Sequence, residues 1–377
     1  MKISTGVVCL VLALVALFSV PAFGQRYHID DLRTNGDDNG PIDGDFSNPA
    51  AISKNGIWAV SKASPPGGGS ARAAYWRRGN DFMLDLGPWL GAFNELNDVN
   101  NAGIACGSVM DQMTGVNGAI TINLTTGLVR LVPIPSAPAG YYVVSSVGLG
   151  ISSNGTIVGR FTLNDGRTFG FVSYPDGTTR NLGPGVATAL NDKVDVAGYV
   201  TTGNTHEACV WRAGNNSPTM LGTLGGINSF ARGINSQGNV VGFSQVADSN
   251  IQKAFWHSGV DDDEMKNLLT LGGNNSQALD TNSRKQTVGS AQLANGAYAA
   301  ALFRVGAAPV NLNTVLTNPI PGVFLESANA INEQQIVCRG VDYSDPNYPT
   351  MHTYILTPDP VPGPGLAKVA CAKPPRR

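Results

Sequence analysis

The chain has 377 residues, of which 42% are hydrophobic and only 14% are charged, and it contains 46 glycines. Charged residues usually make up roughly 25% of a globular protein, so this composition favours short strands and tight turns over long solvent-facing helices. The net charge of −2 offers no basic surface to a phosphate backbone, which argues against a DNA or RNA partner.

The N-terminus predicts a secretory signal peptide over residues 1–24. Lys2 supplies the positive charge, Val7 to Val20 form an apolar stretch, and Ala22 to Gly24 form a small-residue cleavage site. A buried hydrophobic helix is the alternative. The stretch is too short for a transmembrane anchor, which needs about 20 apolar residues. We therefore expect a secreted protein, extracellular or at the cell surface, with the periplasm as the other destination.

A Gly-rich loop that follows the first predicted strand, residues 27–32, is rich in oxygen ligands. These ligands are Asp37, Asp38, Asn39, Asp43 and Asp45. Carboxylate and amide oxygens bind Ca²⁺, so the loop carries the hypothesis of a calcium site, the one cofactor that we expect. Pro41 and Ile42 interrupt the spacing of a recognised calcium loop. A solvated acidic loop is the alternative.

Residues 25–357 read as a single repeat domain. The segment LGTLGG at Leu221 to Gly226 returns as LLTLGG at Leu268 to Gly273, and an Ile-Asn-x-x-Gly-x-Val-Val-Gly pattern recurs in weaker copies. Units about 46 residues long mark a repeat architecture. They are anchored at Ser53, Asn100, Ser152, Asn191, Asn235, Asn282 and Asn332. A residue that recurs in every unit is expected to serve the repeat itself.

Each unit is predicted to form four short strands. In the clearest unit these are residues 229–234, 239–243, 253–256 and 266–271. Four strands in a unit of this length are typical of a β-propeller blade, whereas helical repeats would show a 3.6-residue apolar spacing, which is absent.

The two ends of the repeat domain are out of phase with each other. The last unit finishes with its third strand, residues 352–356, and the N-terminal strand, residues 27–32, has the character of a fourth strand. We therefore predict an all-β, seven-bladed β-propeller with four-stranded blades, in which the N-terminal strand completes the last blade and removes an exposed edge. An eight-bladed or irregular ring is the alternative.

The phrases LGTLGG, SFARGINSQGNVVG and KAFW in residues 221–256 resemble the bacterial HAF family of extracellular repeats. The resemblance covers essentially residues 27–357. It implies a secreted or surface-exposed bacterial protein with a propeller-like fold, and it implies no established activity or catalytic residue. Some members end in a membrane-sorting signal. Residues 358–377 begin Pro-rich and end basic, but their apolar part cannot span a bilayer, so we expect a flexible tail.

Several Cys, His and Trp residues that could serve a functional site occupy positions that recur in the repeat. Cys106 and Cys338 occupy the buried-strand position of Val241, so we interpret them as small hydrophobic residues rather than as a disulfide. His206 and His352 both precede the third strand of a unit, and a scaffold role is expected for them. The tryptophans of the same phase, expected to pack between blades, are Trp76, Trp211 and Trp256.

Three aromatic residues fall outside the repeating phase: Trp89, Tyr343 and Tyr348. Aromatic residues on loops are more often free to contact a ligand than those that recur in a scaffold. They are our candidate contacts for an extracellular glycan or protein.

The sequence lacks a Gly-x-Ser-x-Gly elbow, a His-Glu-x-x-His motif and a phosphate-binding loop. We therefore favour a monomeric, non-enzymatic binding or scaffold module. The alternative is an extracellular polysaccharide hydrolase or lyase that uses Asp37, Asp43 or Asp261 in an axial pocket. A buried carboxylate pair with raised pKa values near the centre would favour that enzyme.

Overall fold

The computed structural model describes residues 25–32, 47–63, 72–80, 83–86, 94–111, 113–260 and 263–360. Apart from one short 3-10 turn, η1 (Leu312–Thr314), every regular element there is a β-strand, which confirms the predicted all-β class. The predicted signal peptide and most of the predicted tail lie outside the described residues. None of the described residues lies in an apolar helix of membrane-spanning length.

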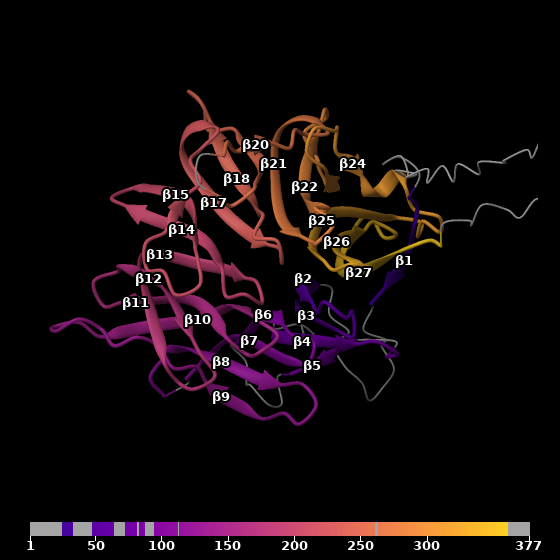
Figure 1. Ribbon diagram of the computed structural model, residues 1–377. Helices are drawn as coiled ribbons and strands as arrows, with labels where there is room; N and C mark the ends of the chain where they lie inside the picture. Colours follow the sequence, from indigo (N-terminus) through magenta and orange to yellow (C-terminus); the bar gives the residue numbers. More distant parts are fainter. Residues whose placement is uncertain are drawn as a thin grey trace, which may run out of the picture.

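The strands follow one another in groups of four, antiparallel within each group (Figure 1). The first two groups are β2 (Ser47–Ile52), β3 (Trp58–Ala63), β4 (Arg72–Arg77) and β5 (Leu84–Asp85), then β6 (Asn94–Val99), β7 (Ile104–Met110), β8 (Asn117–Asn123) and β9 (Val129–Leu131). The next two are β10 (Val143–Ile151), β11 (Ile157–Leu163), β12 (Thr168–Ser173) and the first half of β13 (Thr179–Leu190), then its second half with β14 (Val196–Thr202), β15 (Thr205–Trp211) and β16 (Thr219–Met220).

Two further groups are β17 (Gly225–Ile234), β18 (Val240–Val246), β19 (Gln252–His257) and β20 (Lys266–Asn267), then β21 (Gly272–Thr281), β22 (Thr287–Leu293), β23 (Tyr298–Phe303) and β24 (Val310–Asn311). The final sheet combines β25 (Val323–Ile331), β26 (Ile336–Asp342) and β27 (Thr350–Pro358) with β1 (Tyr27–Asp31). The groups succeed one another around a common centre, which is a β-propeller-like arrangement (Figure 1).

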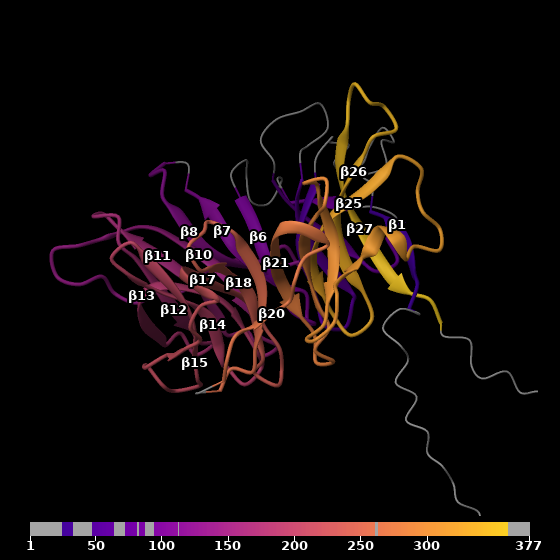
Figure 2. The ribbon, with the colours of Figure 1, turned by 90° about the horizontal axis from the view of Figure 1, so that it is seen from above.

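The N-terminal strand pairs with the C-terminal one. β1 runs antiparallel to β27, in a register that places Tyr27 opposite Pro358 and Asp31 opposite Tyr354. Both views show the two strands side by side (Figures 1 and 2). The pairing predicted between the first strand and the last unit is therefore present, and β1 becomes the fourth strand of that sheet.

The strand β13 belongs to two neighbouring groups at once. Its first half pairs with β12 up to Pro184, and its second half pairs with β14 from Gly185 onward. Gly185 has a φ of +139°, and a Cβ there would lie 2.1 Å from the carbonyl oxygen of Tyr199. Only glycine allows the strand to pass from one group to the next at this point. With a single parallel contact between β8 and β10, it links β6 to β16 in one continuous sheet.

The fourth strand of a unit is shorter than the sequence predicted. In the clearest unit β20 ends at Asn267, whereas the prediction extended to residue 271. Leu269 has a φ of +66°, which breaks the strand, and the next strand already begins at Gly272. The Gly-Gly pair therefore opens the first strand of the following group, so that β17 also starts at Gly225 rather than at residue 229.

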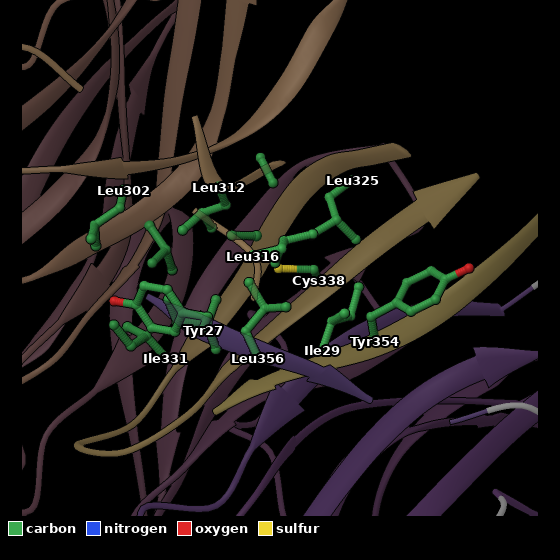
Figure 3. Packing of buried hydrophobic residues seen from close by; sticks show 14 residues of the cluster. Tyr27, Ile29, Leu302, Leu312, Leu316, Leu325, Ile331, Cys338, Tyr354 and Leu356 are labelled. Atoms are coloured by element: carbon green, nitrogen blue, oxygen red, sulfur yellow. The ribbon is translucent and has the colours of Figure 1, made fainter. Parts of the chain in front are cut away.

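The hydrophobic core lies between neighbouring groups. Figure 3 shows one such cluster, where Tyr27 and Ile29 of β1 pack with Leu302 of β23 and Leu356 of β27. Three tryptophans take part in equivalent clusters: Trp76, Trp211 and Trp256. These clusters draw residues from two adjacent groups, so the predicted packing of the tryptophans between units is confirmed.

Three cysteines of the described residues are part of the same core. Cys106, Cys209 and Cys338 are buried, free thiols, and burial raises the pKa of each. The interpretation of Cys106 and Cys338 as small hydrophobic residues is confirmed.

We expect β1 to be essential for stability. Ile29 is 2% exposed in the cluster of Figure 3, so Ile29→Ala should lower the free energy of unfolding by about 2–5 kcal/mol, measured by urea denaturation. The matched control is His28→Ala, because His28 is the exposed neighbour on the same strand and should change it by less than about 0.5 kcal/mol. Equal effects of the two changes would contradict the packing.

Candidate functional site

The first strand of every group carries a β-bulge at the same place, three residues before the repeat anchor. Register shifts mark each bulge. The bulged residues are Ala50, Asn97, Leu149, Thr188, Arg232, Leu279 and Asn329. A bulge turns its side chain away from the regular pleat. All of these residues line one cavity of about 570 Å³, which we call the central cavity.

The repeat anchors join each group to the next. The amide of Asn235 donates from Nδ2 to the carbonyl oxygen of Asn282 at 3.0 Å, and Asn282 donates in the same way to Asn332 at 3.2 Å. Asn332 then donates to Ser53 across most of the chain at 3.0 Å. The amides of Asn100 and Asn191 make equivalent bonds. These residues serve the scaffold, as the sequence predicted for recurring residues.

The same amides also hold their own turns. Asn235 accepts at Oδ1 the backbone N–H groups of Gln237 and Asn239, both at 3.0 Å. The two serine anchors lack this amide, and other groups make the contact to the next group: beside Ser152, the backbone N–H of Ser153 donates to Asp192 Oδ1 at 2.9 Å. Asn55, two residues after Ser53, bonds instead to Asn101 of the next group.

Two carboxylates that the sequence analysis did not single out face the central cavity. Asp98 accepts the N–H of Val99 at Oδ1 and of Ile151 at Oδ2, both at 2.8 Å. Asp280 accepts the N–H of Thr281 at 2.7 Å and of Ile331 at 2.8 Å. Each carboxylate therefore bonds to the group that follows its own.

Burial raises the pKa of Asp98 to about 6 and that of Asp280 to about 7, although the backbone N–H donors act in the opposite direction. The charge of Asp98 also contributes to the raised pKa of Asp280. Both residues could have been recognised from their position in the repeat. They lie two positions before an anchor, where the other units have only Ala or Gly.

The residue that follows each anchor also lines the central cavity. These residues are Lys54, Asn101, Ser153, Asp192, Ser236, Ser283 and Glu333. Lys54 bonds to Asp192 of a non-neighbouring group at 2.6 Å, and both side chains remain partly exposed. Arg232 also lines the cavity, and its guanidinium, whose pKa is lowered by burial, lies 5.4 Å from the centre of the Phe243 ring. The cavity therefore presents charges of both signs.

A second concavity, which we call the side groove, opens between β21–β23 and β25–β26. It has a volume of about 570 Å³ and shares Asn48, Leu279 and Asn329 with the central cavity. Its remaining residues are Gln277, Ser290, Ala297, Tyr298, Phe324, Glu326, Ser327, Arg339 and Tyr343.

The structure separates the candidate aromatic contacts. Tyr343 lies in the side groove and is 48% exposed, whereas Tyr348 is 76% exposed and lines neither cavity. Trp89 lies outside the described residues. So do Asp261 and the whole candidate calcium set, Asp37, Asp38, Asn39, Asp43 and Asp45. In the part of the chain that the structure describes, no group of three or more His, Cys, Asp or Glu side chains is placed to hold a metal ion.

The two repeating histidines take part in packing. His206 lies between Tyr199 and Phe230, with ring centroids at 5.3 and 5.2 Å. His352 lies 3.5 Å from the Asp31 carboxylate and beside Tyr354. Both sets of contacts fit the scaffold role expected from the sequence.

No protein-family model matches the chain, and no curated protein sequence is similar to it. Among solved structures, the β-propeller domain of the Trilobed protease from Pyrococcus furiosus has a TM-score of 0.52 at 8% identity, covering 84% of this chain and 91% of that one. A putative TolB from Agrobacterium tumefaciens has a TM-score of 0.44 at 13% identity, over 64% and 88% of the two chains. An oligogalacturonate lyase in complex with manganese has a TM-score of 0.49 at 8% identity, over 88% and 96%. The first of these matches supports a propeller fold.

The carboxylates of the central cavity predict an unusual dependence of stability on pH. Because the folded-state pKa values of Asp98 and Asp280 lie above 3.8, their protonation favours the folded state, and that contribution is lost as the pH rises through about 6 to 7. The melting temperature should therefore fall between about pH 4 and pH 7 and level off above that range. This fall should flatten in the double variant Asp98→Asn, Asp280→Asn, but not in the exposed control Asp345→Asn. An equally steep fall in the double variant would contradict the assignment.

Proposed function

We propose that this chain is an exported binding module, a closed seven-bladed β-propeller that holds an extracellular ligand in its central cavity. One observation carries the proposal. The anchors are nearly constant, yet the residues on both sides of them that face the cavity differ from unit to unit. A scaffold needs repetition, whereas recognition of a particular ligand needs different groups at equivalent places.

The blade count and ring closure are supported by the contacts between the ends of the chain. Each group of four strands corresponds to one predicted unit. The pairing of β1 with β27 and the bond from Asn332 to Ser53 join the last group to the first. With β1 paired to β27, the last group does not end in a long unpaired strand, and the outermost strands of other groups, such as β20 and β24, are only two residues long, which suits a monomeric protein outside the cell.

Export and the HAF resemblance remain part of this proposal and rest on the sequence. The signal-like residues 1–24 support secretion to the cell surface, the medium or the periplasm.

We also propose calcium binding at the loop of Asp37 to Asp45. A calcium ion held only by the folded chain should raise the melting temperature on titration with calcium chloride. The matched magnesium titration is the control, and an unchanged melting temperature would argue against the site.

One observation favours the enzymatic alternative, a polysaccharide hydrolase or lyase. The carboxylates Asp98 and Asp280 face one cavity and have raised pKa values, as general acids often do. Both oxygens of each carboxylate, however, already accept backbone N–H groups that join neighbouring strand groups or hold the same strand. This occupation favours a structural role and keeps the binding module as the main proposal.

Blocking the central cavity tests the proposal. The mature protein is titrated calorimetrically with neutral oligosaccharides, uronic-acid oligosaccharides, amino acids and short peptides. Leu149→Trp fills the cavity and should weaken binding at least tenfold, whereas Met113→Trp, at a position 96% exposed, should not. Failure of every probe to bind, or equal affinity of the two variants, would contradict the proposal. A parallel assay of reducing-sugar release covers the enzyme, whose turnover should then disappear in the Asp98→Asn, Asp280→Asn variant.

A further inference from the structure

The side groove has exposed aromatic faces at its surface. Tyr298 is 40% exposed at the start of β23, and Tyr343 is 48% exposed just after β26. Phe324 of β25 adds a third ring to the same groove. Aromatic rings that remain open to solvent in a concave site supply flat apolar contact at low entropic cost.

Below these rings the groove is lined by uncharged hydrogen-bonding groups and one matched ion pair. Arg339 donates from Nη2 to Oε2 of Glu326 at 3.1 Å, so the two charges balance. The side chains of Gln277, Ser290 and Ser327 add donors and acceptors without adding charge. The groove as a whole is therefore polar but neutral.

Three polar atoms of residues that line the groove have unused hydrogen-bonding capacity. Arg339 Nε, Asn48 Oδ1 and Asn329 Oδ1 are buried and have no partner among the described residues. Unpaired buried polar atoms cost free energy, and a bound group that supplies the missing partners would recover it. Asn48 and Asn329 also line the central cavity, so the groove adjoins it.

We propose that the side groove binds a neutral oligosaccharide, with sugar rings stacked on Tyr298 and Tyr343. The apolar C–H face of a sugar ring fits against an aromatic ring, and its hydroxyl groups act as both donors and acceptors toward Arg339, Glu326 and the amides. The volume of about 570 Å³ falls in the range of small-ligand sites. An extended peptide is a poorer fit, because the groove is lined by side chains and peptide capture commonly uses a free strand edge.

This inference rests on the proposed binding function and names the ligand class of the groove that adjoins the central cavity. The test titrates the mature protein calorimetrically with cellotetraose, maltotetraose and mannotetraose, and with trigalacturonate and a tetrapeptide for comparison. At least one neutral tetrasaccharide should bind, and trigalacturonate should bind at least tenfold more weakly, because its carboxylates have no unpaired cation in the groove.

Variants of the tyrosines locate the site. Tyr298→Ala and Tyr343→Ala should each weaken binding of the neutral tetrasaccharide about tenfold, the equivalent of about 1.4 kcal/mol. Tyr343→Phe should retain most of the affinity, because it keeps the ring. Tyr348→Ala is the matched control, since Tyr348 follows the same strand but lies outside the groove, and it should bind as the unmodified protein does.

The outcomes separate this inference from the proposed function. Weaker binding in Leu149→Trp with no effect of the tyrosine changes would overturn the side groove and keep the central cavity. The reverse pattern would support the groove and overturn the cavity. Absence of binding by all three neutral tetrasaccharides, or preferential binding of the tetrapeptide, would overturn the inference. Circular dichroism of each variant checks that the fold is intact.

Discussion

The hydrogen bond from each anchor asparagine to the carbonyl oxygen of the next anchor is the constraint on which this molecule depends. The amide satisfies two requirements at once. Oδ1 of Asn235 closes a tight turn at the end of its own first strand, and Nδ2 fixes the distance to Asn282 in the neighbouring group. These anchors are buried, so replacing one would leave several backbone groups without partners. Where serine replaces asparagine, other contacts reach the next group: Asn55 bonds to Asn101 beside Ser53, and the N–H of Ser153 donates to Asp192 beside Ser152.

Fixed anchors leave their neighbours free to vary. The bulge residue three positions earlier and the residue that follows both line the central cavity, and some of them also bond to the next group, as Asn97 and Thr188 do. Arg232, Leu279 and Thr188 therefore occupy equivalent places with entirely different chemistry. This difference is the physical basis for placing ligand recognition in the cavity. The anchor amides keep the arrangement of the groups constant, and the residues on either side of the anchors determine which ligand the cavity can bind.

Much of this fold was predictable because it is encoded locally and repeatedly. The strand pattern, the tight turns after each anchor and the phase offset between residues 27–32 and 352–356 are all visible in the printed sequence. The candidate site was harder to predict from the sequence. Asp98 and Asp280 stand where the other units have Ala or Gly, but their burial depends on the bulges and on the neighbouring strand groups, which the sequence does not show. The side groove unites Tyr298 and Tyr343 from two different groups, and no periodicity in the sequence brings these residues together.

The pairing of β1 with β27 also determines when this protein can finish folding. Its two strands are synthesised first and last, and a contact such as that of Gln25 with Asp359 spans 334 residues. Contacts of such sequence separation form late, because the loop entropy must be overcome before they contribute. Middle groups such as β17–β20 can assemble from local pairs while the chain is still emerging. The sheet that contains β1 has to wait, with its first strand unpartnered, until Pro358 has arrived.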